Sequence, residues 1–230
     1  MAKRPAHSLL ELAFTILVPA LVLMKFSGED ALGPINALLL ALAFPLGWGA
    51  FEMVRQGKPG WLAVLGLVSV LLTGGIGVLA LDPQWLAIKE AAVPGVIGLA
   101  VLISARTRYP LVRTLLYNPA VVDVTRVQQQ LAERGTTEVF EQRLLLANTL
   151  LAGTFFFSSA MNYALATWIV TSPAGSSAFN EELGRLTLLS YPMIALPSML
   201  MMMALLVFLA RTAHSLTGLK FAEMLHAARQ

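Results

Sequence analysis

Six long apolar stretches divide this chain and limit its possible folds more than any other feature of the sequence. Because a helix crosses the hydrocarbon core of a bilayer with about 20 apolar residues, each stretch is long enough to span a membrane. Lipid offers no hydrogen-bond partner to the backbone, so spans of this kind must be helices. The sequence therefore predicts an all-α, polytopic membrane helical bundle. The six expected transmembrane helices lie at about residues 8–25, 32–54, 61–81, 84–105, 143–170 and 187–210.

The composition agrees with a lipid-facing protein and excludes several other classes. Of the 230 residues, 57% are hydrophobic and 13% are charged, whereas soluble domains carry about 25% charged residues. The mean hydropathy of +0.72 is too high for an ordinary soluble globule or a disordered chain. The chain contains no cysteine, which excludes disulfides, thiolate metal sites and cysteine nucleophiles.

The basic residues predict the orientation of the bundle, because Lys and Arg close to span ends are retained in the cytoplasm. If the N-terminus lies inside, 13 of the 16 basic residues fall on the inner side, and only Lys25, Lys89 and Arg185 fall on the outer side. We therefore expect both termini in the cytoplasm and anionic lipids at the inner face. The positive charges are not interleaved with aromatic residues on one soluble face, so we expect no nucleic-acid partner.

One connection is much longer than the others and divides the single membrane domain into three segments. Spans 1 to 4 occupy residues 1–105, a cytoplasmic insert occupies 106–142, and spans 5 and 6 with a tail occupy 143–230. The apolar spacing from Tyr109 to Tyr117 predicts a short amphipathic helix along the membrane surface. Glu138 is expected near the start of a helix that continues into span 5, where a negative charge suits the helix dipole.

A second amphipathic helix is predicted inside the insert. Asn118 is a favourable N-cap, Pro119 suits the first helical position, and Gly135 is a typical helix terminator. The apolar side of this helix, which we call the insert stripe, consists of Val121, Val124, Val127 and Leu131. Two interpretations remain open: the insert is a structural cap on the bundle, or the insert stripe is a docking surface for a partner protein.

Ionisable residues inside apolar spans are the first candidates for function, because one such residue at the centre of a membrane helix costs about 2.5–3.5 kcal/mol. Glu11 lies in the first span, Glu52 near the inner end of the second, and Lys89 with Glu90 in the outer half of the fourth. Lys89 is long enough to snorkel back to the outer surface. Adjacent helical residues point in different directions, so Lys89 and Glu90 are expected to be poor partners for each other.

Polar and small residues four positions apart mark two further helix faces. Ser158 and Asn162 lie on one face of the fifth span, which either packs against another helix or lines a polar path. Ser69, Thr73 and Gly77 lie on one face of the third span. We interpret this second face as a place of close approach between helices.

Four prolines are candidates for hinges. Pro45 lies in the second span, Pro94 in the fourth, and Pro192 and Pro197 in the sixth, whereas the odd-numbered spans contain only Pro19. This placement is compatible with three in-out-in hairpins, each with a broken second helix. Broken helices of that kind can gather freed carbonyl groups around a central site.

No residue pattern typical of an enzyme is present in the sequence. Gly75, Gly77 and Ala80 match a dinucleotide-binding pattern, but they lie inside an apolar span and do not follow a strand. His214 and His226 flank the inner end of span 6 and lack the spacing of metal ligands. We therefore expect no catalytic residue, no metal site, no cofactor and no enzymatic activity.

The third and fourth spans resemble a known group of proteins. A glycine-containing segment at 71–76 is followed by an Asp-Pro-x-aromatic turn at Asp82–Trp85 and by Lys89 and Pro94 in the next helix. This order resembles intracellular septation protein A, and nearly the whole chain is similar to an uncharacterised six-span family grouped with it. Where septation protein A has a second lysine beside the proline, this chain has Val93. The resemblance implies a multi-pass protein of the bacterial inner membrane, linked to envelope or division proteins, and supplies no catalytic residue.

Two functional hypotheses follow. In the first, the chain is a small carrier or channel for a polar solute, ion or lipid. The residues expected to line its path are Glu90, Lys89, Asn162, Ser158 and Glu11. In the second, the chain is a non-transporting scaffold of the cell envelope that recruits partners through the insert. The faces of small residues also permit a homo-oligomer.

The predicted orientation can be tested with reporter fusions. A reporter that is active only in the cytoplasm is expected to be active when fused at Thr125, because the insert is expected on the inner side. A fusion at Asp30, in the connection between spans 1 and 2, is the matched control and is expected to give the opposite result. Activity of an external reporter at Thr125 would contradict the orientation.

Overall fold

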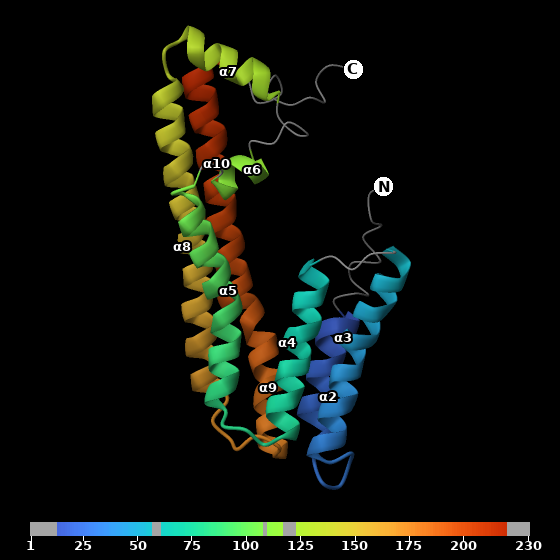
Figure 1. Ribbon diagram of the computed structural model, residues 1–230. Coiled ribbons are helices and arrows are strands. Elements are labelled where there is room, and N and C mark those ends of the chain that lie inside the picture. Colours follow the sequence, from blue (N-terminus) through green and yellow to red (C-terminus); the bar gives the residue numbers. More distant parts are fainter. Residues whose placement is uncertain (1–12, 57–60, 108–109, 117–122, 220–230) are drawn as a thin grey trace. The chain divides into compact units, whose positions relative to one another are not determined.

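The computed structural model describes residues 13–56, 61–107, 110–116 and 123–219. Every regular element in these ranges is a helix, which confirms the predicted all-α class (Figure 1). In chain order the elements are the π-helix η1 (Ala13–Leu17), α2 (Val18–Phe26), α3 (Pro34–Gln56), α4 (Trp61–Val78), α5 (Gln84–Ser104), α6 (Leu111–Leu116), α7 (Val124–Glu133), α8 (Thr137–Ile169), α9 (Ser177–Ser190), the π-helix η2 (Tyr191–Ala195) and α10 (Leu196–Thr217).

Four helical segments in the described part of the chain are long and apolar enough to cross a membrane, and they lie at predicted spans 2, 4, 5 and 6. Their bounds are Pro34–Phe51, Gln84–Ser104, Thr137–Ile169 and Ser177–Thr217. Two shorter apolar helices, Phe14–Phe26 and Leu65–Val78, lie where spans 1 and 3 are expected. The prediction of membrane-spanning helices is thus supported at four positions, while the total of six spans and the orientation stay predictions.

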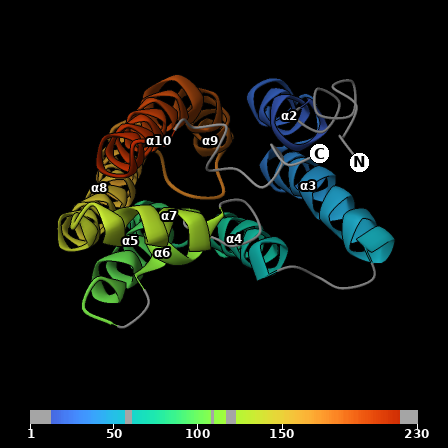
Figure 2. The same ribbon diagram turned by 90° about the horizontal axis from the view of Figure 1, so that it is seen from above.

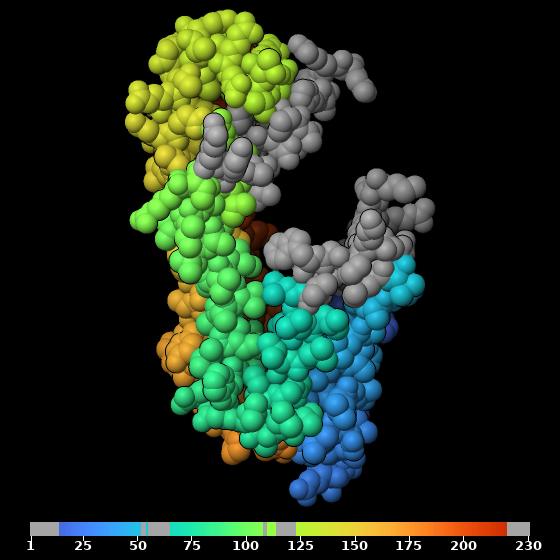
Figure 3. All heavy atoms as spheres, in the orientation of Figure 1, coloured from blue at the N-terminus to red at the C-terminus, as the bar shows by residue number. Residues whose placement is uncertain are grey.

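Large apolar side chains lie on the outer faces of these helices. Trp85, Val96 and Leu99 of α5 are exposed, and α5 runs along the surface in the space-filling view (Figure 3). Trp168 near the end of α8 is exposed as well. Such faces are unfavourable in water, whereas lipid tails are as apolar as the side chains themselves. The helices are therefore consistent with an integral membrane protein.

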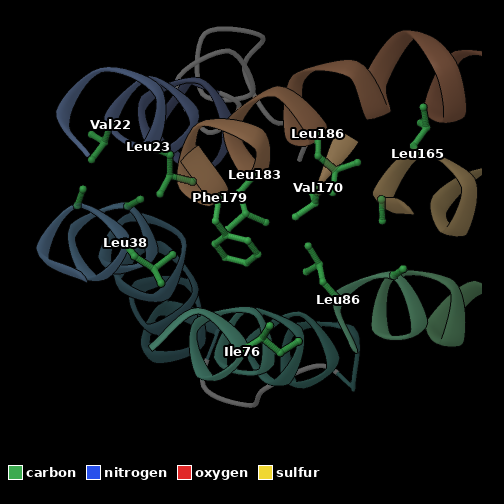
Figure 4. Packing of buried hydrophobic residues seen from close by; sticks show 14 of the residues in the cluster. Val22, Leu23, Leu38, Ile76, Leu86, Leu165, Val170, Phe179, Leu183 and Leu186 are labelled. Carbon is green, nitrogen blue, oxygen red and sulfur yellow. The ribbon is translucent and has the colours of Figure 1, made fainter. Parts of the chain in front are cut away.

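The chain forms two compact units, of which the first comprises Met1–Ala92 and Ala160–Ala195. Within this unit α2 packs against both α3 and α9, and α3 packs against α4 (Figure 2). The ring of Phe179 on α9 is fully buried and points into a core that it shares with Leu38 of α3 (Figure 4). Gly77 of α4 permits this packing, because a Cβ atom there would collide with Leu38 Cδ2. The close approach predicted at Gly77 is confirmed.

The second unit comprises Val93–Ser159 and Leu196–Gln230 and contains the insert. Here α7 packs against α10, and Val127 and Leu131 are fully buried in the core of the unit. At these two residues the insert stripe therefore faces the chain's own helices, which supports the interpretation of the insert as a structural cap. Val121, the first residue of the stripe, lies outside the described residues.

The boundaries of α7 agree with the prediction at one end only. Gly135 follows the helix with a φ of +66°, as expected for a terminator. The predicted start is wrong, because α7 begins at Val124 and its N-cap is Asp123, whose carboxylate accepts a hydrogen bond from the Arg126 backbone N–H at 3.1 Å. An aspartate directly before the first turn supplies this acceptor. Residues 118–119, which carry the predicted cap, lie outside the described residues.

Helices are present at the other two positions predicted for the insert, while the placement of the first along the membrane surface stays a prediction. α6 lies within the predicted range 109–117. α8 begins at Thr137 with Glu138 in its first turn and continues without interruption for 33 residues. The fifth span therefore extends well beyond its apolar part, into the insert.

Proline does not break the helices of the first two predicted hairpins. Pro45 lies inside α3 and Pro94 inside α5, and both helices continue beyond them. The predicted broken helix is wrong at these two positions, since local adjustment and neighbouring groups compensate for one missing backbone donor in a membrane helix. Pro192 lies in η2 and Pro197 in the first turn of α10, so the backbone geometry changes between them. A hinge role for the four prolines stays a prediction.

The space around two glycines, Gly184 at the contact between α9 and α2 and Gly153 on α8, predicts different effects for their replacement by alanine. Gly184→Ala is expected to destabilise the protein by about 1–3 kcal/mol, because the new Cβ would lie 2.9 Å from the backbone oxygen of Ala20. Gly153→Ala on α8 is the matched control, because no atom lies within 4 Å of the Cβ position there, and it is expected to be neutral or stabilising by about 0.5–1 kcal/mol. Thermal unfolding in detergent measures both; equal effects would contradict this packing.

Candidate functional site

A short connection places Lys89 at the same level as Thr73 on the preceding helix. Asp82 caps the start of α5, because its carboxylate accepts a hydrogen bond from the Gln84 backbone N–H at 2.8 Å. Lys89 lies five residues after the first residue of α5, and Thr73 lies five residues before the last residue of α4. The connection reverses the chain direction, so the two positions face each other across the hairpin.

The ammonium of Lys89 lies among four oxygen atoms, all in the first unit. Nζ donates to Thr73 Oγ1 at 2.7 Å, to Ser69 Oγ at 3.2 Å and to the Ser69 backbone oxygen at 3.5 Å. Glu90 Oε1 lies 2.7 Å from the same nitrogen and forms an ion pair with it. We call the group formed by Ser69, Thr73 and Glu90 the Lys89 cage. The side chain of Lys89 is 10% exposed and that of Glu90 is 31% exposed.

This geometry corrects two expectations about Lys89. The prediction that Lys89 and Glu90 are poor partners is wrong, because the two long side chains meet beside the helix although their Cα–Cβ bonds diverge. The prediction that Lys89 snorkels back toward the α4–α5 connection is also wrong. Nζ reaches Ser69, which lies one helical turn farther from that end than Thr73. Two hydroxyl groups on α4 offer the ammonium partners inside the bundle, so it does not need water.

The hydrogen-bond directions inside the Lys89 cage are mutually consistent. Thr73 Oγ1 donates its proton to the Ser69 backbone oxygen at 3.1 Å, so its lone pairs remain available to the ammonium. The three protons of Lys89 can therefore point at Thr73 Oγ1, Ser69 Oγ and Glu90 Oε1. Hydrogen bonds of this charge-assisted kind are strong where water is excluded. The ammonium is fully used within the chain and has no donor left for an anionic ligand.

The Glu90 carboxylate is the more accessible half of the pair. It is about three times as exposed as Lys89, and Lys89 is the partner that the structure assigns to it. Pro94 lies four residues further along α5 and has no N–H, so it cannot donate to the Glu90 backbone oxygen as an ordinary residue would. The Glu90 carboxylate is therefore partly exposed, and the Glu90 backbone oxygen lacks the donor that it would have in a regular helix.

The remaining predicted path residues do not join this pair among the described contacts. Ser158 on α8 forms a hydrogen bond of 2.9 Å with Ser198 on α10, within the second unit. Asn162 is half-buried on α8, in the first unit. Glu11 lies outside the described residues, and so does the side chain of Glu52. Of the five path candidates, Lys89 and Glu90 are the two that the described contacts bring together.

The sequence interpretation missed the role of Ser69 and Thr73. Their spacing predicts a packing face, which holds at Gly77, but one and two turns earlier the same face supplies hydroxyl groups to a lysine. The available signal was a hydroxyl residue, Thr73, at the same distance from the α4–α5 connection as Lys89, with a second hydroxyl residue, Ser69, one helical turn farther away.

A buried amide that the functional hypotheses did not use connects α8 to the start of the insert. Asn148 is fully buried; its Oδ1 accepts from the Val112 backbone N–H at 3.1 Å, and its Nδ2 donates to the Val101 backbone oxygen at 2.6 Å. The amide therefore satisfies backbone groups of both α5 and α6. This is a structural role, which fixes the short helix α6 to α5 and α8 within the second unit.

No family model, curated protein or solved structure matches this chain. The resemblance to the septation protein A group stays a prediction. Within the described residues, no three His, Asp or Glu side chains come close enough together to hold a metal ion.

Replacement of one cage residue tests whether the cage stabilises the protein. Thr73→Val keeps the shape of the side chain and removes the acceptor for Lys89, so we expect a loss of about 1.5–3 kcal/mol of stability, the value of a hydrogen bond to a charged group. Thr167→Val is the matched control, because Thr167 donates only to the Tyr163 carbonyl of its own helix in the described contacts, and we expect a change within about 0.5 kcal/mol. Unfolding in detergent measures both, and equal losses would contradict the role of Thr73.

Proposed function

We propose that this chain is a small membrane carrier or channel for a polar solute, ion or lipid, with the Lys89–Glu90 pair on its path. The observation that carries the proposal is an ion pair, with two hydroxyl partners, inside apolar helices of the first unit. Charges in membrane helices are costly, and they generally mark the pathways of substrates, ions or protons.

Glu90 is the member of the pair that we propose for contact with a solute, because it is the more exposed of the two. Here Lys89 is enclosed and satisfied, whereas Glu90 keeps 31% of its side-chain surface exposed. A carboxylate that an adjacent lysine holds in place offers a fixed negative charge of the kind that marks substrate and ion pathways.

The scaffold hypothesis has less support from the described residues. It relies on a free insert stripe, and Val127 and Leu131 of that stripe are buried against the chain's own helices. The proposal keeps a bacterial inner-membrane location, with anionic lipids at the inner face, because the basic residues are concentrated near the span ends expected on that side. A relationship to the septation protein A group and self-association are further parts of the proposal.

Flux measurements in proteoliposomes test the proposed function. The probes are K⁺, methylammonium, glutamate and glycerol, together with a fluorescent phospholipid for lipid movement. We expect at least one probe to move faster with the wild-type chain than in protein-free vesicles. Glu90→Gln and Lys89→Met are then expected to lower that rate by about tenfold or more, because each removes a charge-assisted hydrogen bond from the path.

Glu181→Gln is the matched control for the loss of an ion pair. Glu181 pairs with Arg185 on an exposed face of α9, where such pairs contribute little, so its flux is expected to equal that of the wild type. If every probe moves equally fast with the wild type and both path variants, while all three proteins stay monodisperse, the transport proposal is wrong.

A further inference from the structure

The four oxygen atoms around Lys89 Nζ form the kind of ligand set that binds a monovalent metal ion. They are one carboxylate oxygen, two hydroxyl oxygens and one backbone carbonyl oxygen, at 2.7 to 3.5 Å from the nitrogen. Membrane channels and transporters use carbonyl and side-chain oxygens in place of the hydration shell of Na⁺ or K⁺. In this chain the centre of the set is occupied by the end of a side chain.

We propose that the Lys89 cage is a monovalent-cation site whose resident cation is the chain's own ammonium. The inference concerns the site of the proposed function, but it is a statement about ion binding and does not require that any solute is transported. It explains why a lysine stands in an apolar helix with its ammonium surrounded by oxygen atoms of the chain itself. Its charge serves to fill a negative, oxygen-lined position permanently.

The charge and size of the cage define the ion that would replace the ammonium. Without Lys89, the cage carries the single negative charge of Glu90, so a monovalent ion neutralises it, whereas a divalent ion would leave an uncompensated positive charge in an apolar region. The distances are those of an ammonium hydrogen-bonded to oxygen. Ammonium and K⁺, which have similar sizes, are therefore expected to fit better than the smaller Na⁺.

Removal of the tethered ammonium should create an ion-binding protein. In Lys89→Ala the cage is empty, so the melting temperature of the full chain in detergent is expected to be higher in ammonium or potassium chloride than in choline chloride at equal ionic strength. For an ion at ten times its dissociation constant, the expected shift is about 3–6 °C. The wild type is expected to melt at the same temperature in all these salts, because its own ammonium already occupies the position.

Two control variants separate a specific site from a general salt effect. Lys89→Met fills the same space with an uncharged chain, and the double variant Lys89→Ala with Glu90→Gln removes the negative charge. Neither should respond to the choice of cation. A response of equal size in either control, or no response in a folded Lys89→Ala, would overturn the proposal.

The folding of Lys89→Ala is a further test of the cation site. If Lys89→Ala is monodisperse in ammonium but not in choline, the site is supported. If it fails in every salt, Lys89→Cys replaces it, because the chain has no other cysteine and a thiol reagent can attach an ethylammonium or a neutral ethyl group there. Equal stability of the two adducts would overturn the proposal.

The cation site and the transport function can fail separately. If Glu90→Gln loses flux but Lys89→Ala binds no ion, transport stands and the cation site is rejected. If Lys89→Ala binds an ion but Glu90→Gln keeps its flux, the cation site stands and the transport path is rejected.

Discussion

A polar group inside hydrocarbon finds no water to bond with, and this constraint accounts for most of the local structure of the chain. It explains why the regular elements in the described ranges are helices, since a helix satisfies its backbone internally. It also explains the hydroxyl side chains, which repeatedly donate to the carbonyl four residues earlier in their own helix. The residues that do so include Ser27, Thr149, Thr154, Thr167, Thr187 and Ser190.

The same constraint turns the few longer polar side chains into connections between elements. Asn180 on α9 donates from Nδ2 to Ser27 Oγ at 3.1 Å and to the Pro34 backbone oxygen at 2.7 Å, and it thereby ties α9 to the connection between α2 and α3. Asn148 does the equivalent for α5 and α6 in the second unit. Lys89 differs from both amides because it carries a charge, so its position needs a counter-charge as well as hydrogen-bond partners.

Features that depend on backbone spacing along one helix could be predicted from the sequence, whereas features that depend on the reach of a side chain or on the relative level of two helices could not. The long apolar runs correctly predicted helices, and Gly135 correctly predicted the end of α7. The pairing of Lys89 with Glu90 was missed because a helical wheel places adjacent residues about 100° apart, and it ignores the reach of flexible side chains. The spacing of Ser69 and Thr73 predicts a helix face but does not say which side chain contacts it. That depends on how the α4–α5 connection aligns the two helices along their axes.

A tethered cation and a free ion would give the same cage different properties. A free ion loses its translational freedom on binding and leaves the site partly empty when its concentration falls. Lys89 loses only side-chain freedom, about 1.5–2 kcal/mol, so the cage is filled at any ionic composition, and α5 is held to α4 by a charge that cannot diffuse away. A cation that reaches the exposed carboxylate of Glu90 then competes for one of the four oxygens around Lys89 and leaves the other three in place. Those three oxygens belong to Ser69 and Thr73 of α4, so a cation at Glu90 would take away the counter-charge of the ammonium while the hydrogen bonds that link α5 to α4 stay in place.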